Sequence, residues 1–169
     1  MNRMLIGVAL VAVSTGALAQ DVAETDWAYF EPEGAPLQAG VVAQDGSQLI
    51  LKCDKPGKRS VYAVVATNSS LAPPMSDDRY ESHPVTLRMD ENPPWDDNWR
   101  FNGRFAMAVD KGNVRSLTRL LEKLHDADKL ELRLQPIMRS PVTIEYEVTG
   151  ARDAIERVYA SCKDTIPIS

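Results

Sequence analysis

Alternation of apolar and polar residues along the chain predicts several β-strands. It is clearest in "KLELRLQ" (129–135) and "VTIEYEV" (142–148), where nearly every second side chain is apolar. Successive side chains of a strand point to opposite faces, so these two segments are expected to pair antiparallel with one face in water. The same pattern predicts strands at 37–43 and 48–53, joined by the hairpin turn Asp45-Gly46, and further strands at 61–67, 84–90 and 104–110.

Two other segments repeat apolar residues at three- and four-residue spacing, which predicts helices at 114–125 and 151–162. Asn113 is the expected N-cap of the first helix. The order is a run of strands, a helix, two strands and a helix. It indicates an α+β fold, with a largely antiparallel β-sheet or sandwich and two helices.

The N-terminus has the pattern of a secretory signal peptide. Arg3 is followed by a short apolar run at 4–13, and "ALA" at 17–19 supplies the small residues required for cleavage before Gln20. Ten apolar residues are too few to cross a bilayer, which needs about 20. We therefore expect a signal peptide at 1–19, an N-terminal arm at 20–36 and a single domain at 37–169. The cleaved protein is expected not to span the membrane and to be periplasmic or secreted.

The two cysteines lie on apolar faces of the expected elements. Cys53 shares a strand face with Leu49 and Leu51, and Cys162 lies on the apolar stripe of the last helix. Because a cysteine pair in an exported protein is usually bonded, we expect a Cys53–Cys162 disulfide. It would close a loop of 109 positions, which the chain-entropy model values at about 4–5 kcal/mol.

Charge excludes one class of partner. Without residues 1–19 the chain has 150 residues, with 18 basic against 24 acidic groups and a net charge of −6. A chain this acidic is a poor candidate for binding nucleic acid through its phosphates. Two cysteines and two histidines match no zinc spacing, so neither a metal nor a cofactor is expected.

The stretch "MDENPPWDDNW" (89–99) holds most of the candidate binding residues. Four carboxylates could offer oxygens to a hard cation such as Ca²⁺, namely Asp90, Glu91, Asp96 and Asp97. Their spacing is not that of a calcium loop, and a solvated loop also carries such residues. Trp99 leads into an apolar segment and is the expected core anchor. Trp95 lies on the predicted loop and is the candidate for contacting a partner, since tryptophan is enriched in binding hot spots.

Arg115, Arg119 and Lys123 recur every four residues on the first predicted helix, opposite its apolar stripe. They could form a cationic strip for an acidic partner, or simply a solvated helix face. Both interpretations remain open.

No nucleophile, acid–base pair or catalytic motif is recognisable, so no catalytic residue is predicted. The leading hypothesis is a non-enzymatic, exported binding or accessory protein of the cell envelope. The alternative is a hydrolase of envelope polymers, or an inhibitor of one, with its site in the acidic and tryptophan-containing loop at 90–99. A metal-stabilised structural domain is a third possibility.

The layout from "LILKCD" through "VTLRMD" and "LTRLLEKLHDADKLELRL" to "VTIEYEVTGARDAIERVYASC" carries a resemblance. Over roughly residues 49–162 the chain resembles small periplasmic proteins of the TagO/VasI kind, which are associated with type VI secretion, and related exported domains with the same Cys-to-Cys layout. The matched positions are structural. The resemblance implies a binding or accessory module, and it transfers no catalytic residues. As the partner of such a module we expect an envelope protein or polymer.

Overall fold

Nine strands of this chain form one antiparallel sheet in the computed structural model, which describes residues 27–54, 56–57, 61–75 and 80–168. The order across the sheet is β1-β2-β3-β4-β7-β6-β5-β10-β11, and β8 and β9 form a separate two-stranded ribbon. The strands are β1 (Ala28–Phe30), β2 (Gln38–Val42), β3 (Gln48–Lys52), β4 (Tyr62–Ala66), β5 (Glu81–Met89), β6 (Trp95–Asn102), β7 (Phe105–Ala108), β8 (Asp110–Lys111), β9 (Val114–Arg115), β10 (Lys129–Leu134) and β11 (Val142–Glu147). The two helices are α1 (Ser116–Leu124) and α2 (Ala151–Cys162). The prediction of an α+β fold is confirmed, with a single large sheet instead of a sandwich. The predicted signal peptide and the first part of the predicted arm lie outside the described residues.

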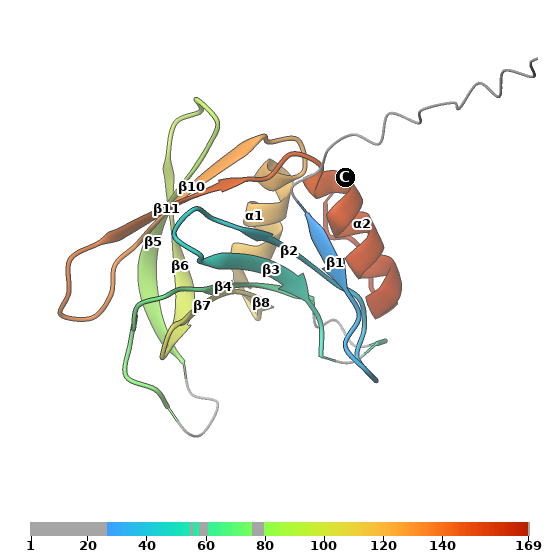
Figure 1. Cartoon of the computed structure of the whole chain (residues 1–169), viewed down its shortest axis with the longest axis horizontal. Helices are drawn as coiled ribbons and strands as arrows, with labels where there is room; N and C mark the ends of the chain where they lie inside the picture. Colours follow the sequence, from blue (N-terminus) through green and yellow to red (C-terminus); the bar gives the residue numbers. More distant parts are fainter. Residues whose placement is uncertain (1–26, 55, 58–60, 76–79, 169) are drawn as a thin grey trace, which may run out of the picture.

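The sheet curls until its two edges approach each other (Figure 1). β1 and β11 are the edge strands, and Trp27 lies directly before β1 while Val148 lies directly after β11. The buried indole nitrogen of Trp27 donates a hydrogen bond to the Val148 carbonyl at 3.1 Å. The inner side of the curl and the apolar faces of the two helices form a single core. Neither described helix is long and apolar enough to cross a membrane.

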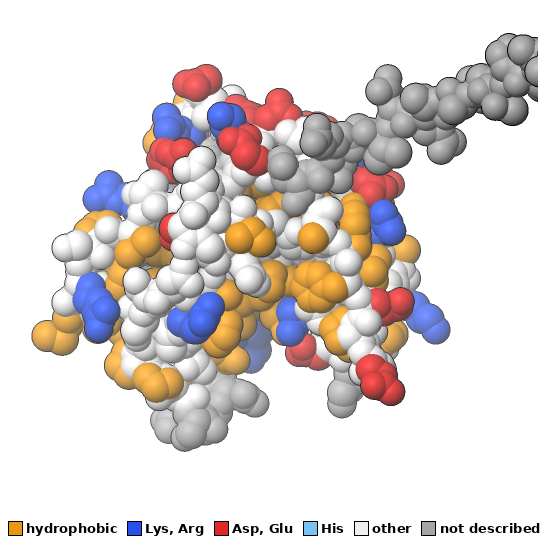
Figure 2. Space-filling model, in the orientation of Figure 1, with side chains coloured by type: hydrophobic (Ala, Val, Ile, Leu, Met, Phe, Trp, Pro, Cys, Tyr) orange, Lys and Arg blue, Asp and Glu red, His pale blue; other side chains and the backbone are white. Residues whose placement is uncertain are grey.

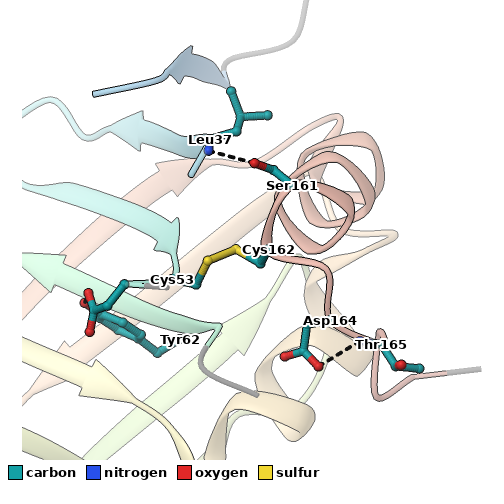
Figure 3. The surroundings of a disulfide bond; sticks show 8 residues. Leu37, Cys53, Tyr62, Ser161, Cys162, Asp164 and Thr165 are labelled. Carbon is teal, nitrogen blue, oxygen red and sulfur yellow. Dashed lines mark hydrogen bonds between the residues drawn. A yellow bond between two sulfur atoms is a disulfide. The ribbon is translucent and has the colours of Figure 1, made fainter. Parts of the chain in front are cut away.

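The terminal helix α2 is fastened to the sheet by a disulfide (Figure 3). Cys53 directly follows β3, and Cys162 is the last residue of α2. Their sulfurs are bonded, with 6.2 Å between the Cα atoms, and both residues are buried. Nearby, the backbone nitrogen of Leu37 donates to Ser161 Oγ at 2.9 Å, which ties the chain before β2 to the same helix. The predicted Cys53–Cys162 disulfide is confirmed.

Helix α1 begins two residues later than the sequence pattern predicts, and Asn113 is not its N-cap. Val114 and Arg115 pair with the two residues of β8 in a small ribbon, so they are extended instead of helical. The helix start is capped from a distance by Asp110, whose Oδ1 accepts hydrogen bonds from the backbone nitrogens of Leu117 at 3.0 Å and Thr118 at 3.2 Å. The negative charge of this carboxylate also interacts favourably with the helix dipole, whose positive end lies at the start of the helix.

Strand β5 is longer than predicted and includes Pro84, which cannot donate a ladder hydrogen bond. Pro84 pairs with Asn98 of β6, whereas the pairing with β10 starts only at Val85. The proline therefore lies where one side of the strand has no ladder partner, which is where a sheet tolerates it. Glu81 to His83, which precede the strand predicted at 84–90, extend it along β6.

The tyrosines make the fold sensitive to alkaline pH. Burial is the main cause that raises the pKa of Tyr146 and Tyr159, and burial followed by a hydrogen bond to Asp153 raises the pKa of Tyr29 to about 12. An unfolded tyrosine has a pKa of about 10, so the folded state favours the neutral phenol. This stabilisation is fully present below pH 10 and is lost as the pH rises from about 10 to 12.

We therefore expect the free energy of unfolding to fall steadily above about pH 10, and phenolate absorbance to rise together with the loss of the circular dichroism signal. A matched Y29F variant, which retains the buried tyrosines, should lose slightly less stability over the same range. Ionisation of all tyrosines near pH 10 with the fold intact would contradict the expectation.

Candidate functional site

The stretch 89–99 is a β-hairpin, and only its first half is a loop. Residues 90–94 form the turn, and β6 starts at Trp95, paired with Leu87 of β5. The expectation of a loop through residue 99 is therefore wrong. The sequence of this part of β6 does not alternate between apolar and polar residues, because the second side chain that points inward is the charged residue Asp97. The strand could therefore not be recognised from the pattern.

Asp90 holds the turn in place. It has a φ of 49°, a left-handed conformation that few residues other than glycine adopt, and aspartate is among those that tolerate it. Its Oδ1 accepts hydrogen bonds from the backbone nitrogens of Asp128 at 3.1 Å and Lys129 at 2.8 Å. One oxygen of this carboxylate is thus committed to connecting the β5–β6 turn with the start of β10.

Asp97 and Arg119 are engaged with each other. The Asp97 carboxylate is buried and accepts hydrogen bonds from Arg119 Nη2 at 2.5 Å, Arg119 Nε at 3.2 Å and Ser116 Oγ at 3.0 Å. The hydrogen bond to Asp97 raises the pKa of the Arg119 guanidinium above its ordinary value. These hydrogen bonds hold α1 against β6. Because the carboxylate is buried and already bonded to Arg119 and Ser116, it is not available to a ligand.

Asp96 and Arg115 lie elsewhere. Asp96 points to the outer face of the sheet, where it accepts a hydrogen bond from Thr86 Oγ1 at 2.7 Å. Arg115 is exposed and lines a separate hollow of about 380 Å³ beside Tyr159 and Ile166. The structure therefore does not gather the candidate residues into one site.

What remains is a groove around Trp95, with a volume of about 440 Å³. It lies between the β5–β6 turn and the C-terminal end of α1, and it is lined by Met89, Asp90, Asn92, Pro93, Trp95, Lys123, Asp126 and Ala127. Trp95 is partly exposed, whereas Trp27 and Trp99 are buried. Of the described tryptophans, only Trp95 can therefore offer its ring to a second molecule. The indole nitrogens of Trp95 and Trp99 are buried without a hydrogen-bond partner among the described residues.

Charged groups surround the Trp95 ring. Lys123 Nζ lies 5.0 Å from the ring centroid, a distance at which a cation is attracted to an aromatic face. Asp126 lies on the same wall, with its Oδ2 2.9 Å from His125 Nε2, and it also accepts a hydrogen bond from Arg152 Nη2. The groove thus combines an aromatic surface, one ammonium group and two carboxylates that are already bonded within the protein.

Sequence reasoning found Trp95 and Asp90 but missed Asn92, Pro93 and Asp126. Asp126 comes from the end of α1, about thirty residues away in sequence, and no local spacing connects it with the hairpin. Lys123 carries a signal, because it is the third residue of the cationic strip expected on the first helix. That signal indicates an exposed helix face and does not indicate what the face meets.

No group of three metal-ligating side chains occurs in the part of the chain that the structure describes. Comparisons with protein-family models, with curated proteins and with solved structures found no match to this chain. The geometry of the groove is therefore the main guide to function.

Proposed function

We propose that this chain is a non-catalytic binding domain of the cell envelope, and that it holds an envelope protein or polymer in the Trp95 groove. The observation that carries the proposal is the partly exposed ring of Trp95 at the wall of a groove of about 440 Å³. Large, rigid aromatic side chains with one accessible surface supply much of the energy of binding sites.

The state of the carboxylates supports binding over hydrolysis. A hydrolase of envelope polymers would use one carboxyl group as an acid and a second as a base or nucleophile. In the groove, Asp90 accepts two backbone hydrogen bonds and Asp126 is paired with Arg152. Both groups are engaged in stabilising the walls of the groove.

Export is part of the proposal. Its support is the signal-peptide pattern of residues 1–19, together with a buried disulfide, which persists in oxidising compartments. The resemblance of the Cys53–Cys162 layout to TagO/VasI-like proteins supports an accessory role in the envelope, in which a secretion system is one source of the partner.

Photo-crosslinking from the groove tests the proposal. With benzoylphenylalanine in place of Asn92, an exposed groove residue, the exported chain is expected to crosslink an envelope component in living cells. The matched control carries the same group at Thr143, an exposed position of β11 on the outer face of the sheet. For the purified component, W95A is expected to weaken binding about 30-fold, the typical cost of losing a tryptophan hot spot.

Two results would contradict the proposal. Equal crosslinking from positions 92 and 143 would show that the groove has no special role. Release of soluble fragments from purified cell-wall sacculi by the native chain would show that it is a hydrolase. Trp95 also packs against the core, so W95A could weaken binding by destabilising the fold. The N92A variant removes no core atoms, and it should weaken binding as well while unfolding at the same urea concentration as the native chain.

A further inference from the structure

Three turns meet at the end of the molecule opposite the groove. They are the loop at 71–75, the β6–β7 turn at 102–105 and the β10–β11 turn at 135–141, and together we call them the basic tip (Figure 1, lower left). The Gly103 carbonyl accepts hydrogen bonds from the backbone nitrogens of Leu71 at 2.8 Å and Ala72 at 3.0 Å. The Leu71 carbonyl accepts one from Ile137 at 2.9 Å. These bonds join the three turns into one ordered surface.

Met138 is presented to solvent at the apex of the β10–β11 turn. Its side chain is 99% exposed, more than any other large hydrophobic residue described. Its φ of 55° lies in the left-handed region, where a long side chain is disfavoured. The turn is held beside it by a hydrogen bond from Gln135 Nε2 to the Arg139 carbonyl at 3.1 Å. An unsupported methionine in this conformation adds nothing to the fold, which points to a role outside it.

The three turns of the tip also carry exposed apolar and basic residues. Phe105 is 44% exposed, and Pro73 and Pro74 are exposed as well. The three turns contain no acidic residue. Arg104 and Arg139 belong to the tip itself, and both are exposed. On the outer sheet face behind the tip lie Arg100 and Arg133.

These four arginines form no ion pair with any residue that the structure describes. Arg104 lies near the Phe105 ring, with 5.8 Å between the guanidinium carbon and the ring centroid. Glu81, the acidic residue at the nearby start of β5, is instead 3.2 Å from His83. Asp77 and Asp78 fall in a segment outside the described residues and are not counted as part of the tip. The coloured side chains at this end in Figure 2 are mainly hydrophobic and basic.

We infer that the basic tip docks onto the surface of an anionic lipid bilayer, with Met138 entering the interface and the arginines facing lipid phosphates. Charge complementarity selects this occupant, because arginines without an ion-pair partner among the described residues, on the same surface as an exposed apolar residue, match anionic headgroups above hydrocarbon. The tip is convex. A protein partner would need a recess of matching shape, whereas a bilayer accommodates a protruding side chain.

The acidic remainder of the chain does not prevent this contact. The groove end and the tip are separated by the eight residues of β6, which corresponds to roughly 23 Å at the usual rise of a strand. Charges at that distance are screened, because the Debye length at physiological salt is about 8 Å. The attraction to the bilayer therefore depends on the charges near the tip. The combined contribution of four arginines and one methionine corresponds to a dissociation constant of roughly millimolar lipid.

Co-sedimentation with vesicles tests the inference. The native chain is expected to bind vesicles of equal parts phosphatidylglycerol and phosphatidylcholine, to bind pure phosphatidylcholine much less, and to be released by salt. R139S is expected to weaken binding about fivefold. The matched control, K129S, removes the same charge from an exposed site near the groove end and should leave binding unchanged.

Met138 is tested by M138G, which is expected to weaken vesicle binding about tenfold through the loss of apolar contact. Glycine adopts a positive φ without strain, so M138G should unfold at the same or a higher urea concentration than the native chain. Equal losses for R139S and K129S would overturn the inference, since the attraction would then depend only on total charge. Native binding by M138G, or no binding of the native chain to anionic vesicles, would also overturn it, and a protein partner would become the better occupant.

Discussion

Replacing both Cys53 and Cys162 with alanine is expected to lower the free energy of unfolding by about 2–5 kcal/mol. The bond closes 109 positions of the chain, so its removal releases a large part of the unfolded ensemble from a constraint. It also connects the end of α2 directly to the end of β3, two elements that are distant in sequence. In the native state the substitutions remove only a buried contact between two sulfur atoms. Most of the change in the free energy of unfolding is therefore expected to come from the unfolded state, which gains conformational freedom.

Urea unfolding of the native chain and the double alanine variant, each with and without a reductant, measures this effect. The native chain should lose stability on reduction, and the variant should not respond. Equal stability of the oxidised native chain and the variant would show that strain in the bond cancels its entropic benefit. A variant that fails to fold would show a loss that exceeds the remaining stability of the domain.

Replacing Trp99 with alanine is expected to cost about 3–5 kcal/mol, the second large effect. Trp99 is fully buried at an inward position of β6, and it is the largest completely buried side chain described. Phenylalanine at the same position should cost only about 1–2 kcal/mol, because it retains most of the apolar contact. The indole nitrogen has no hydrogen-bond partner among the described residues, so no hydrogen bond is lost with it.

The comparison of W99A with W99F distinguishes packing from hydrogen bonding. Chemical denaturation of both variants should place W99F much nearer to the native chain. A W99F variant as unstable as W99A would show that the indole nitrogen has a hidden partner, such as an internal water molecule. W95F, at the partly exposed tryptophan of the same strand, is the matched control and should change stability little.

The elements that could be predicted from the sequence are those with a regular pattern. Apolar and polar residues alternate without interruption in β10 and β11. Helix α2 lies at the predicted residues because its apolar stripe is complete and because Gly150, with a φ of 86°, is its N-cap. The inward directions of Cys53 and Cys162 followed from the same periodicities, which is why their disulfide could be predicted.

Two of the failures have a related physical cause, which is a polar residue whose partner lies outside the local pattern of apolar and polar positions. Asp97 interrupts the apolar side of β6, because its charge is satisfied by Arg119 of α1. Asn113 looks like a cap, but Asp110 reaches the helix start from the preceding ribbon. The Trp95 groove has the same origin, since its walls come from a hairpin and from a helix end that only the folded chain brings together.

The contact between Trp27 and Val148 has a consequence for aggregation. Edge strands expose unpaired backbone groups, which another chain can use as a template for sheet growth. Here β1 has only three residues, and Tyr29 within it donates a hydrogen bond to Asp153 of α2 at 2.7 Å. At the other edge, the residue after β11 is already bonded to the residue before β1. β1 therefore offers only a short free edge to a second copy, and the end of β11 is tied to the opposite edge of the sheet.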